Sequence, residues 1–155
     1  MLSRPVQRWS FVLGKVLEMV LGAGVIALAA WLGLVLGVQT LPVALPLTNY
    51  LLAAGVAWLL FAALGSGAFL IASCFSRTAL SNALGAAWTI LAFVLDVIPF
   101  FANSPLGWIN PWRHYFPQEI VATGQVDPFG LIVLFAWLVG GAGAAVVIFD
   151  RRDLA

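Results

Sequence analysis

The sequence predicts an all-α, polytopic membrane protein with four spanning helices, and three observations indicate this fold class. Of the 155 residues, 63% are hydrophobic and 8% are charged, whereas soluble domains are about 45–50% apolar and about 25% charged. No Asp, Glu, Lys, Arg or His occurs between Met19 and Ser76, which is room for two crossings of about 20 residues each. The basic residues also gather at one set of predicted helix ends. We expect a single transmembrane domain over residues 1–155.

The first two crossings form a hairpin, expected at about residues 16–38 and 50–75. Pro42 and Pro46, with polar neighbours, interrupt the apolar stretch between them, because proline breaks a helix. The preceding residues 1–15 combine basic and aromatic side chains, and we expect them to lie at the cytoplasmic membrane surface. Lys15 and Glu18 are three positions apart and can pair on one helix face.

The third and fourth crossings are expected at about residues 80–101 and 129–149. Asp96 alone interrupts the apolar character of the third, and the fourth ends at a charged run, residues 150–153. The outer loop between them, residues 102–128, holds four prolines and several aromatic residues. We expect a short helix there, over about residues 112–123, that rests on the outer leaflet or re-enters it.

The basic residues set the orientation. With both termini in the cytoplasm, six of the seven basic residues lie inside and only Arg113 lies outside, as the positive-inside rule requires. Tyr50 and Tyr115 then fall at the outer interface, where aromatic residues gather. The sequence therefore predicts a multi-pass protein of the plasma or inner membrane with cytoplasmic N and C termini.

Small residues recur at helical spacing. Gly33 and Gly37 form a G-x-x-x-G pair, Ala63 and Gly67 have the same spacing, and glycines and alanines cluster over residues 140–145. Such residues allow helices in lipid to approach closely. The spacing fits packing within the bundle as well as packing against another subunit.

Few residues of the chain are candidates for catalysis or for binding a metal or a nucleotide. The single histidine, His114, and the single cysteine, Cys74, stand apart from any cluster that could hold a metal. No G-x-x-x-x-G-K-[ST] nucleotide-binding loop occurs, and no basic and aromatic pattern indicates nucleic-acid binding. We therefore expect no catalytic residue, metal or cofactor in this chain.

Asp96 is the most informative single residue of the expected spanning helices. A carboxylate there is costly unless it faces a wet cavity or a partner. It is a candidate for lining a pathway or pairing with Arg113 or His114. The alternative is a shallow carboxylate that reaches interfacial water or caps the break before Pro99.

Four segments, in order, resemble type-2 ATP-binding-cassette (ABC) exporter permeases. The N-terminal run Leu2-Ser3-Arg4-Pro5-Val6-Gln7-Arg8-Trp9 and the following Phe11-Val12-Leu13-Gly14-Lys15 are similar to their cytoplasmic segment. Residues 76–80 resemble their short inner turn. The outer stretch Trp112-Arg113-His114-Tyr115-Phe116-Pro117 and the closing Phe149-Asp150-Arg151-Arg152-Asp153-Leu154 also resemble theirs.

The resemblance implies a permease that dimerises with a second permease chain and couples to a separate ABC ATPase, which would bind the ATP. It implies that residues 1–15 dock on the ATPase through Arg4, Arg8 and Lys15. It also implies a re-entrant outer gate around Trp112, Arg113, His114, Tyr115 and Glu119. Family members have six crossings and this chain starts just before the third, so we expect the first two to be lost by truncation or supplied by another polypeptide.

The predicted function is thus that of an exporter permease that catalyses no chemical reaction itself. The alternative is a small membrane accessory protein, or a degraded permease, that transports nothing. An intramembrane enzyme needs a catalytic pair, and Asp96 stands alone on the spanning helices. The apolar helices do not identify the substrate.

Overall fold

The structure is a computed structural model that describes residues 8–40, 42 and 44–151, with Arg8 described by its backbone alone. These residues form helices and no strand, which confirms the predicted fold class. The elements are α1 (Arg8–Val38), α2 (Leu47–Ser73), α3 (Thr78–Val97), α4 (Pro99–Ala102), α5 (Pro105–Ile109), the 3-10 helix η1 (Pro111–His114), α6 (Pro117–Thr123) and α7 (Pro128–Asp150).

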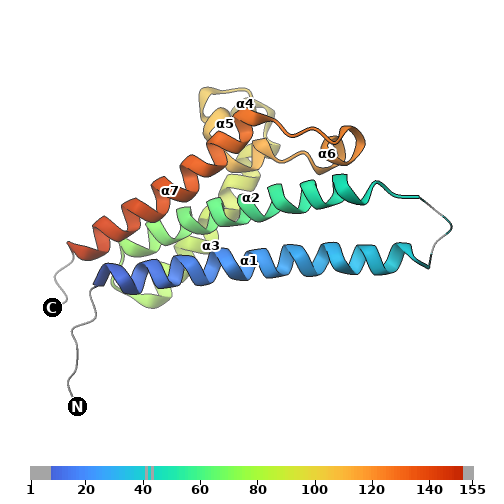
Figure 1. Cartoon of the computed structure of the whole chain (residues 1–155). Coiled ribbons are helices and arrows are strands. Elements are labelled where there is room, and N and C mark those ends of the chain that lie inside the picture. Colours follow the sequence, from blue (N-terminus) through green and yellow to red (C-terminus); the bar gives the residue numbers. More distant parts are fainter. Residues whose placement is uncertain (1–7, 41, 43, 152–155) are drawn as a thin grey trace, which may run out of the picture.

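Four of the described helices, α1, α2, α3 and α7, are long and apolar enough to cross a membrane. The predicted number of crossings is therefore confirmed by length and composition. α1 begins and α7 ends at the same end of the bundle (Figure 1). Below, this end is called the inner end and the other the outer end, following the orientation predicted from the basic residues.

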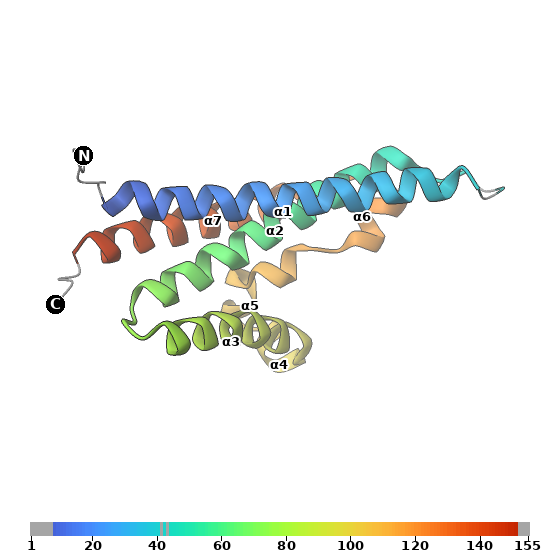
Figure 2. The same cartoon turned by 90° about the horizontal axis from the view of Figure 1, so that it is seen from below.

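α2 is the central helix of the bundle and packs against α1, α3 and α7 (Figure 2). Its middle is buried, and Leu60, Ala62, Ala63 and Ser66 are fully inaccessible. Small residues make this packing close: a Cβ added at Gly141 of α7 would lie 2.9 Å from the backbone carbon of Ser66. The core is thus a seam of small side chains along α2, as expected for helices in lipid.

The two predicted small-residue pairs differ in their surroundings. Gly67 of α2 lies under Trp88 of α3, where a Cβ would be 2.5 Å from the indole nitrogen, and Ala63 is fully buried. In contrast, a Cβ at Gly33 or Gly37 of α1 would meet nothing within 4 Å. The first pair packs inside the bundle, and the second faces away from it.

α1 begins earlier than the crossing expected from about residue 16. Residues 8–15 continue into the same helix and do not form a separate surface segment. No proline or break lies between them and the apolar stretch, and Lys15 Nζ donates to Glu18 Oε2 at 2.7 Å, the predicted pair. With 31 residues, α1 is about 46 Å long, more than the roughly 30 Å hydrocarbon core.

α3 ends at Val97, four residues before the expected boundary at 101. Pro99 explains the difference, because a proline disfavours helical backbone in the residue before it. Ile98 is accordingly extended, with φ −82° and ψ 114°, and the chain resumes as the single turn α4. The other boundaries lie within a few residues of those predicted.

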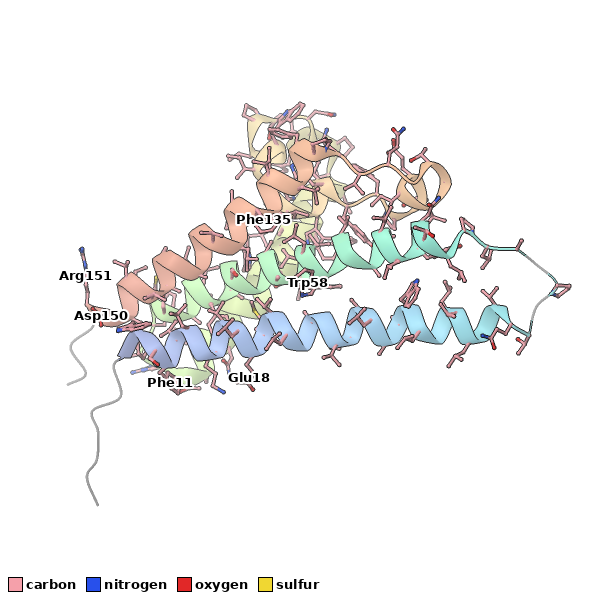
Figure 3. The ribbon with its side chains drawn as sticks, in the orientation of Figure 1. Phe11, Glu18, Trp58, Phe135, Asp150 and Arg151 are labelled. Carbon is pink, nitrogen blue, oxygen red and sulfur yellow. The ribbon has the colours of Figure 1, made fainter. Side chains whose placement is uncertain are left out.

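Large apolar side chains are exposed over much of α1, α3 and α7, including Leu21, Ile90 and Val139. In water such a surface would be unfavourable, whereas in a bilayer it faces lipid. Charged side chains such as Glu18 and Arg151 gather toward the inner end (Figure 3). The pattern is that of a bundle whose solvent is lipid.

Candidate functional site

The connection between α3 and α7 re-enters the bundle. Asn110 Nδ2 donates to the Ala92 carbonyl of α3 at 2.7 Å, and Trp137 Nε1 of α7 donates to the Ile109 carbonyl at 2.6 Å. Ala92 lies five residues before the end of α3 and Trp137 nine residues after the start of α7. At about 1.5 Å per residue, the connection dips about 7 Å along α3 and about 13 Å along α7.

Two polar side chains of this re-entrant segment, residues 105–116, have partners within it. Asn110 Oδ1 accepts from the Trp112 backbone N–H at 3.3 Å, and His114 Nε2 lies 2.9 Å from the Trp108 carbonyl. Pro105 and Pro111 start its short helices, where a missing N–H costs nothing. Irregular backbone at membrane depth requires such local satisfaction or a covering of protein.

The predicted outer-gate residues divide into two groups. Trp112, Arg113 and His114 form η1 with Pro111, and η1 contacts α2, α3 and α7. Tyr115 follows directly and Glu119 lies apart, exposed on α6. The structure therefore brings four of the five residues to the junction of three spanning helices.

Their side chains pack mainly through their rings. Trp112 meets Phe93 of α3 edge to face, with ring centroids 5.4 Å apart, and its indole nitrogen is buried without a hydrogen-bond partner. His114 packs against Phe129 of α7 at 5.7 Å. Burial raises the pKa of Tyr115 above its ordinary value, so its phenol stays neutral.

One helix over residues 112–123 does not form. Pro117 starts α6, and the two residues between η1 and α6 are not helical, Tyr115 being extended with ψ 99° and Phe116 having ψ 79°. α6 is instead held against α2, because Asn49 Nδ2 donates to the Val121 carbonyl at 2.9 Å. Gly124, with φ 68°, ends α6 in the left-handed conformation that favours glycine.

Asp96 is the second-last residue of α3, nearer the outer end than expected. It is partly exposed. The ion pair formed by the described residues is Lys15–Glu18, so Asp96 is paired with neither Arg113 nor His114 there. The position fits a carboxylate that reaches interfacial water.

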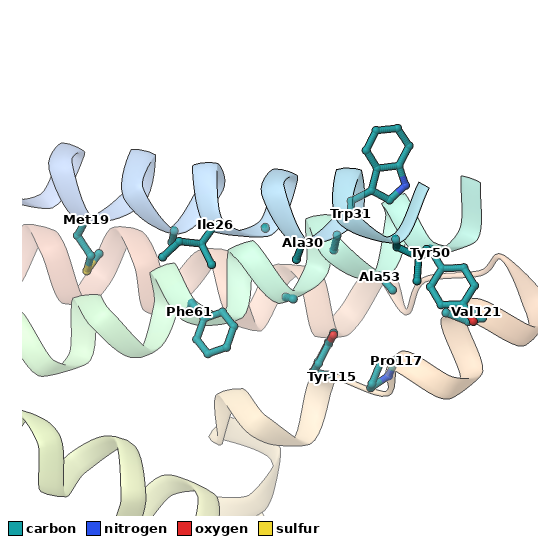
Figure 4. A pocket seen from close by; sticks show the side chains of 15 residues that line it. Met19, Ile26, Ala30, Trp31, Tyr50, Ala53, Phe61, Tyr115, Pro117 and Val121 are labelled. Carbon is teal, nitrogen blue, oxygen red and sulfur yellow. The ribbon is translucent and has the colours of Figure 1, made fainter. Parts of the chain in front are cut away.

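A cavity of about 650 Å³ lies between α1, α2 and the segment from Tyr115 to α6 (Figure 4). Apolar side chains dominate its lining, among them Ala30 and Phe61. The sequence predicts Tyr50 and Tyr115 at the outer interface, and the structure adds that both line this cavity. No periodic signal marks it, because it depends on how α1 and α2 diverge.

The inner end presents the predicted docking residues only in part. Arg4 lies outside the described residues, and Arg8 has no described side chain. Lys15 is about half exposed in its pair with Glu18 and lines a second cavity, of about 540 Å³, with Phe11 and residues of α2, α3 and α7. Over the described ranges, no three His, Cys, Asp or Glu side chains group as a metal site.

Comparison with known proteins gives one finding. No curated protein and no solved structure matches the chain. The sequence profile described as ABC-2 family transporter protein matches residues 1–154, a span that includes all four candidate crossings, the re-entrant segment and the inner end. The chain belongs to the ABC-2 family of transporter proteins.

Proposed function

We propose that this permease works in an ATP-driven exporter, with ATP bound and hydrolysed by a separate ATPase subunit. Family membership makes the chain a membrane transport component. The observation that carries the proposal is the re-entrant segment held between α3 and α7 by Asn110 and Trp137. In membrane proteins, backbone of this kind at depth occurs where it is covered by protein or lines a pathway.

The ATPase would dock at the inner end, on residues 1–15. Arg4, Arg8 and Lys15 are the positions proposed for this contact, and an exposed amine at Lys15 suits a partly acidic surface. Because α1 runs without a break from Arg8 to Val38, a shift of its first turns would move the whole helix.

α1 would carry that shift to the outer half of the bundle through its contacts with α2. Trp58 Nε1 of α2 donates to the Val20 carbonyl at 2.8 Å, and Trp31 Nε1 of α1 donates to the Leu47 carbonyl at 3.1 Å. The two helices are thus tied near the middle of α1 and again in its outer third. We propose that they rock together against α7.

The outer gate would be η1 with Tyr115 and α6, at the junction of α2, α3 and α7. Opening it would displace Trp112 from Phe93 and release the Asn110 bond to Ala92. These few contacts are weak enough for a conformational change to break them. The gate therefore acts by steric closure, and the chain itself breaks no bond of the substrate.

A second permease chain, identical or different, would complete the exporter. Gly33 and Gly37 on α1 and Gly140 and Gly143 on α7 have open space where a side chain would be. Small residues on a lipid-facing surface favour close contact with another helix. These two faces are available for that packing.

Purification of the tagged chain from its native membrane in mild detergent tests the proposal. We expect vanadate-sensitive ATP hydrolysis to co-purify with a protein that carries a nucleotide-binding loop. The variant with Arg8→Glu and Lys15→Glu should lose that activity at least several-fold, while Gln125→Glu, which adds a negative charge at the other end outside the proposed gate, should retain it. Purification without ATPase activity, or equal loss in both variants, contradicts the proposal and favours an accessory protein.

A further inference from the structure

The cavity between α1, α2 and the outer gate is a narrow slot that runs along the helices. Its lining on α1 extends from Met19 to Leu34, about 22 Å at about 1.5 Å per residue. Alanines of both helices line the slot, among them Ala30 of α1 and Ala53 of α2 (Figure 4). Small residues opposite small residues leave the space open, while Met19 and Phe61 lie toward its inner end.

The slot is held open by contacts on either side of it. At the inner side, Met19 packs onto Gly65, where a Cβ would overlap the methionine sulfur. At the outer side, Trp31 Nε1 binds the Leu47 carbonyl. Because α1 is fixed to α2 at both places, it does not collapse onto the alanines between them.

The dimensions restrict the occupant. A volume of about 650 Å³ spread along about 22 Å of α1 describes an elongated space. The volume lies within the range of about 300–1,000 Å³ typical of small-molecule sites. A thin, extended molecule fits.

The lining restricts the chemistry. No Asp, Glu, Lys, Arg or His lines the slot, and its hydroxyl groups belong to Tyr50 and Tyr115. Neither hydroxyl has a hydrogen-bond partner among the residues that the structure describes. A charge would be unfavourable in this surrounding, whereas an uncharged polar group could bind either phenol.

We propose that the slot binds one alkyl chain of the transported molecule, a single-chain amphiphile whose polar group is uncharged and meets Tyr50 or Tyr115. The slot borders the outer gate through Tyr115, Pro117 and Val121. A rocking of α1 and α2 would change its width beside the exit. The assignment of the bound chain as cargo rests on the proposed function, whereas the binding site itself does not.

Photolabelling of the full chain in lipid nanodiscs tests the site without any ATPase. The probe is a monoacylglycerol with a diazirine in its chain, and labelled residues are mapped by mass spectrometry. We expect label on the slot faces of α1 and α2. Ala30→Leu should reduce this labelling at least five-fold, and Ala29→Leu should not change it, because Ala29 is a neighbouring alanine outside the slot lining.

Ala57→Leu fills the slot from α2 and should give the same loss, which guards against a folding effect specific to α1. The Tyr50→Phe and Tyr115→Phe double variant should weaken competition by unlabelled monoacylglycerol. Labelling spread evenly over lipid-facing residues, or equal in the Ala29 and Ala30 variants, overturns the site. Competition by diacyl phosphatidylcholine alone would make it a lipid site and overturn the substrate class. Absence of a partner ATPase would overturn the proposed function while leaving the labelling intact.

Discussion

Asn110 is the residue whose replacement most directly tests the re-entrant segment. Its side chain donates to the Ala92 carbonyl at 2.7 Å and accepts from the Trp112 backbone N–H at 3.3 Å. Asn110→Ala removes both bonds at once. The segment then loses this hydrogen bond to α3, and the first turn of η1 loses its cap.

The expected magnitude follows from these two bonds. A side-chain hydrogen bond between elements in a membrane protein contributes about 0.6 kcal/mol on average, and a buried N–H left without a partner costs about 1–3 kcal/mol. We therefore expect Asn110→Ala to lower the free energy of unfolding by about 1–3 kcal/mol, since part of each cost is relieved by relaxation. This corresponds to about a 5- to 150-fold change in the unfolding equilibrium.

Unfolding of the purified protein by increasing fractions of sodium dodecyl sulfate, followed by tryptophan fluorescence, measures this change. Asn103→Ala is the matched control, because Asn103 lies in the same connection and its side chain makes no hydrogen bond among the described residues. Hydrogen exchange of residues 109–116 should accelerate only in the Asn110 variant. Equal stability of the two variants, or unchanged exchange, would refute the re-entrant geometry.

Three further substitutions test other contacts. Gly67→Ala should destabilise the protein by about 1–3 kcal/mol because its Cβ would lie 2.5 Å from the Trp88 indole nitrogen, whereas Gly55→Ala, with nothing within 4 Å, should be neutral in the same unfolding assay. Asp127→Ala removes the cap that accepts from two backbone N–H groups of α7 and should cost about 1 kcal/mol; a stability equal to wild type would mean that water caps α7 as well. Asp96→Asn should leave unfolding and co-purified ATP hydrolysis unchanged, and a several-fold loss of hydrolysis would show that the carboxylate acts in a pathway.

The sequence predicts the four crossings because hydropathy reports how each helix meets lipid. The break near Pro99 follows from local backbone sterics, as does the Lys15–Glu18 pair from helical spacing. α1 begins earlier than the expected crossing, because the prediction places the charged residues before the helix and not within it. Residues 8–15 carry charges and still continue the helix, since a helix of this length can extend beyond the bilayer.

The site was predictable only in its residues and not in its geometry. The outer aromatic residues were expected near a gate, and η1 gathers Trp112, Arg113 and His114. Its depth depends on the Asn110–Ala92 bond, between residues 18 positions apart. The position of α6 depends on the Asn49–Val121 bond, between residues 72 apart. Such pairings, and the slot between α1 and α2, arise from tertiary packing, which no local pattern encodes.

The orientation of the bundle underlies every functional assignment, and Cys74 measures it directly. The single cysteine of the chain is exposed at the end of α2, on the proposed cytoplasmic side. A membrane-impermeant maleimide should leave it unlabelled in intact cells and label it after permeabilisation. In a Cys74→Ser background, Thr40→Cys at the opposite end of the hairpin should be labelled in intact cells. Labelling of Cys74 from outside, with protection of the cysteine at position 40, would contradict the account.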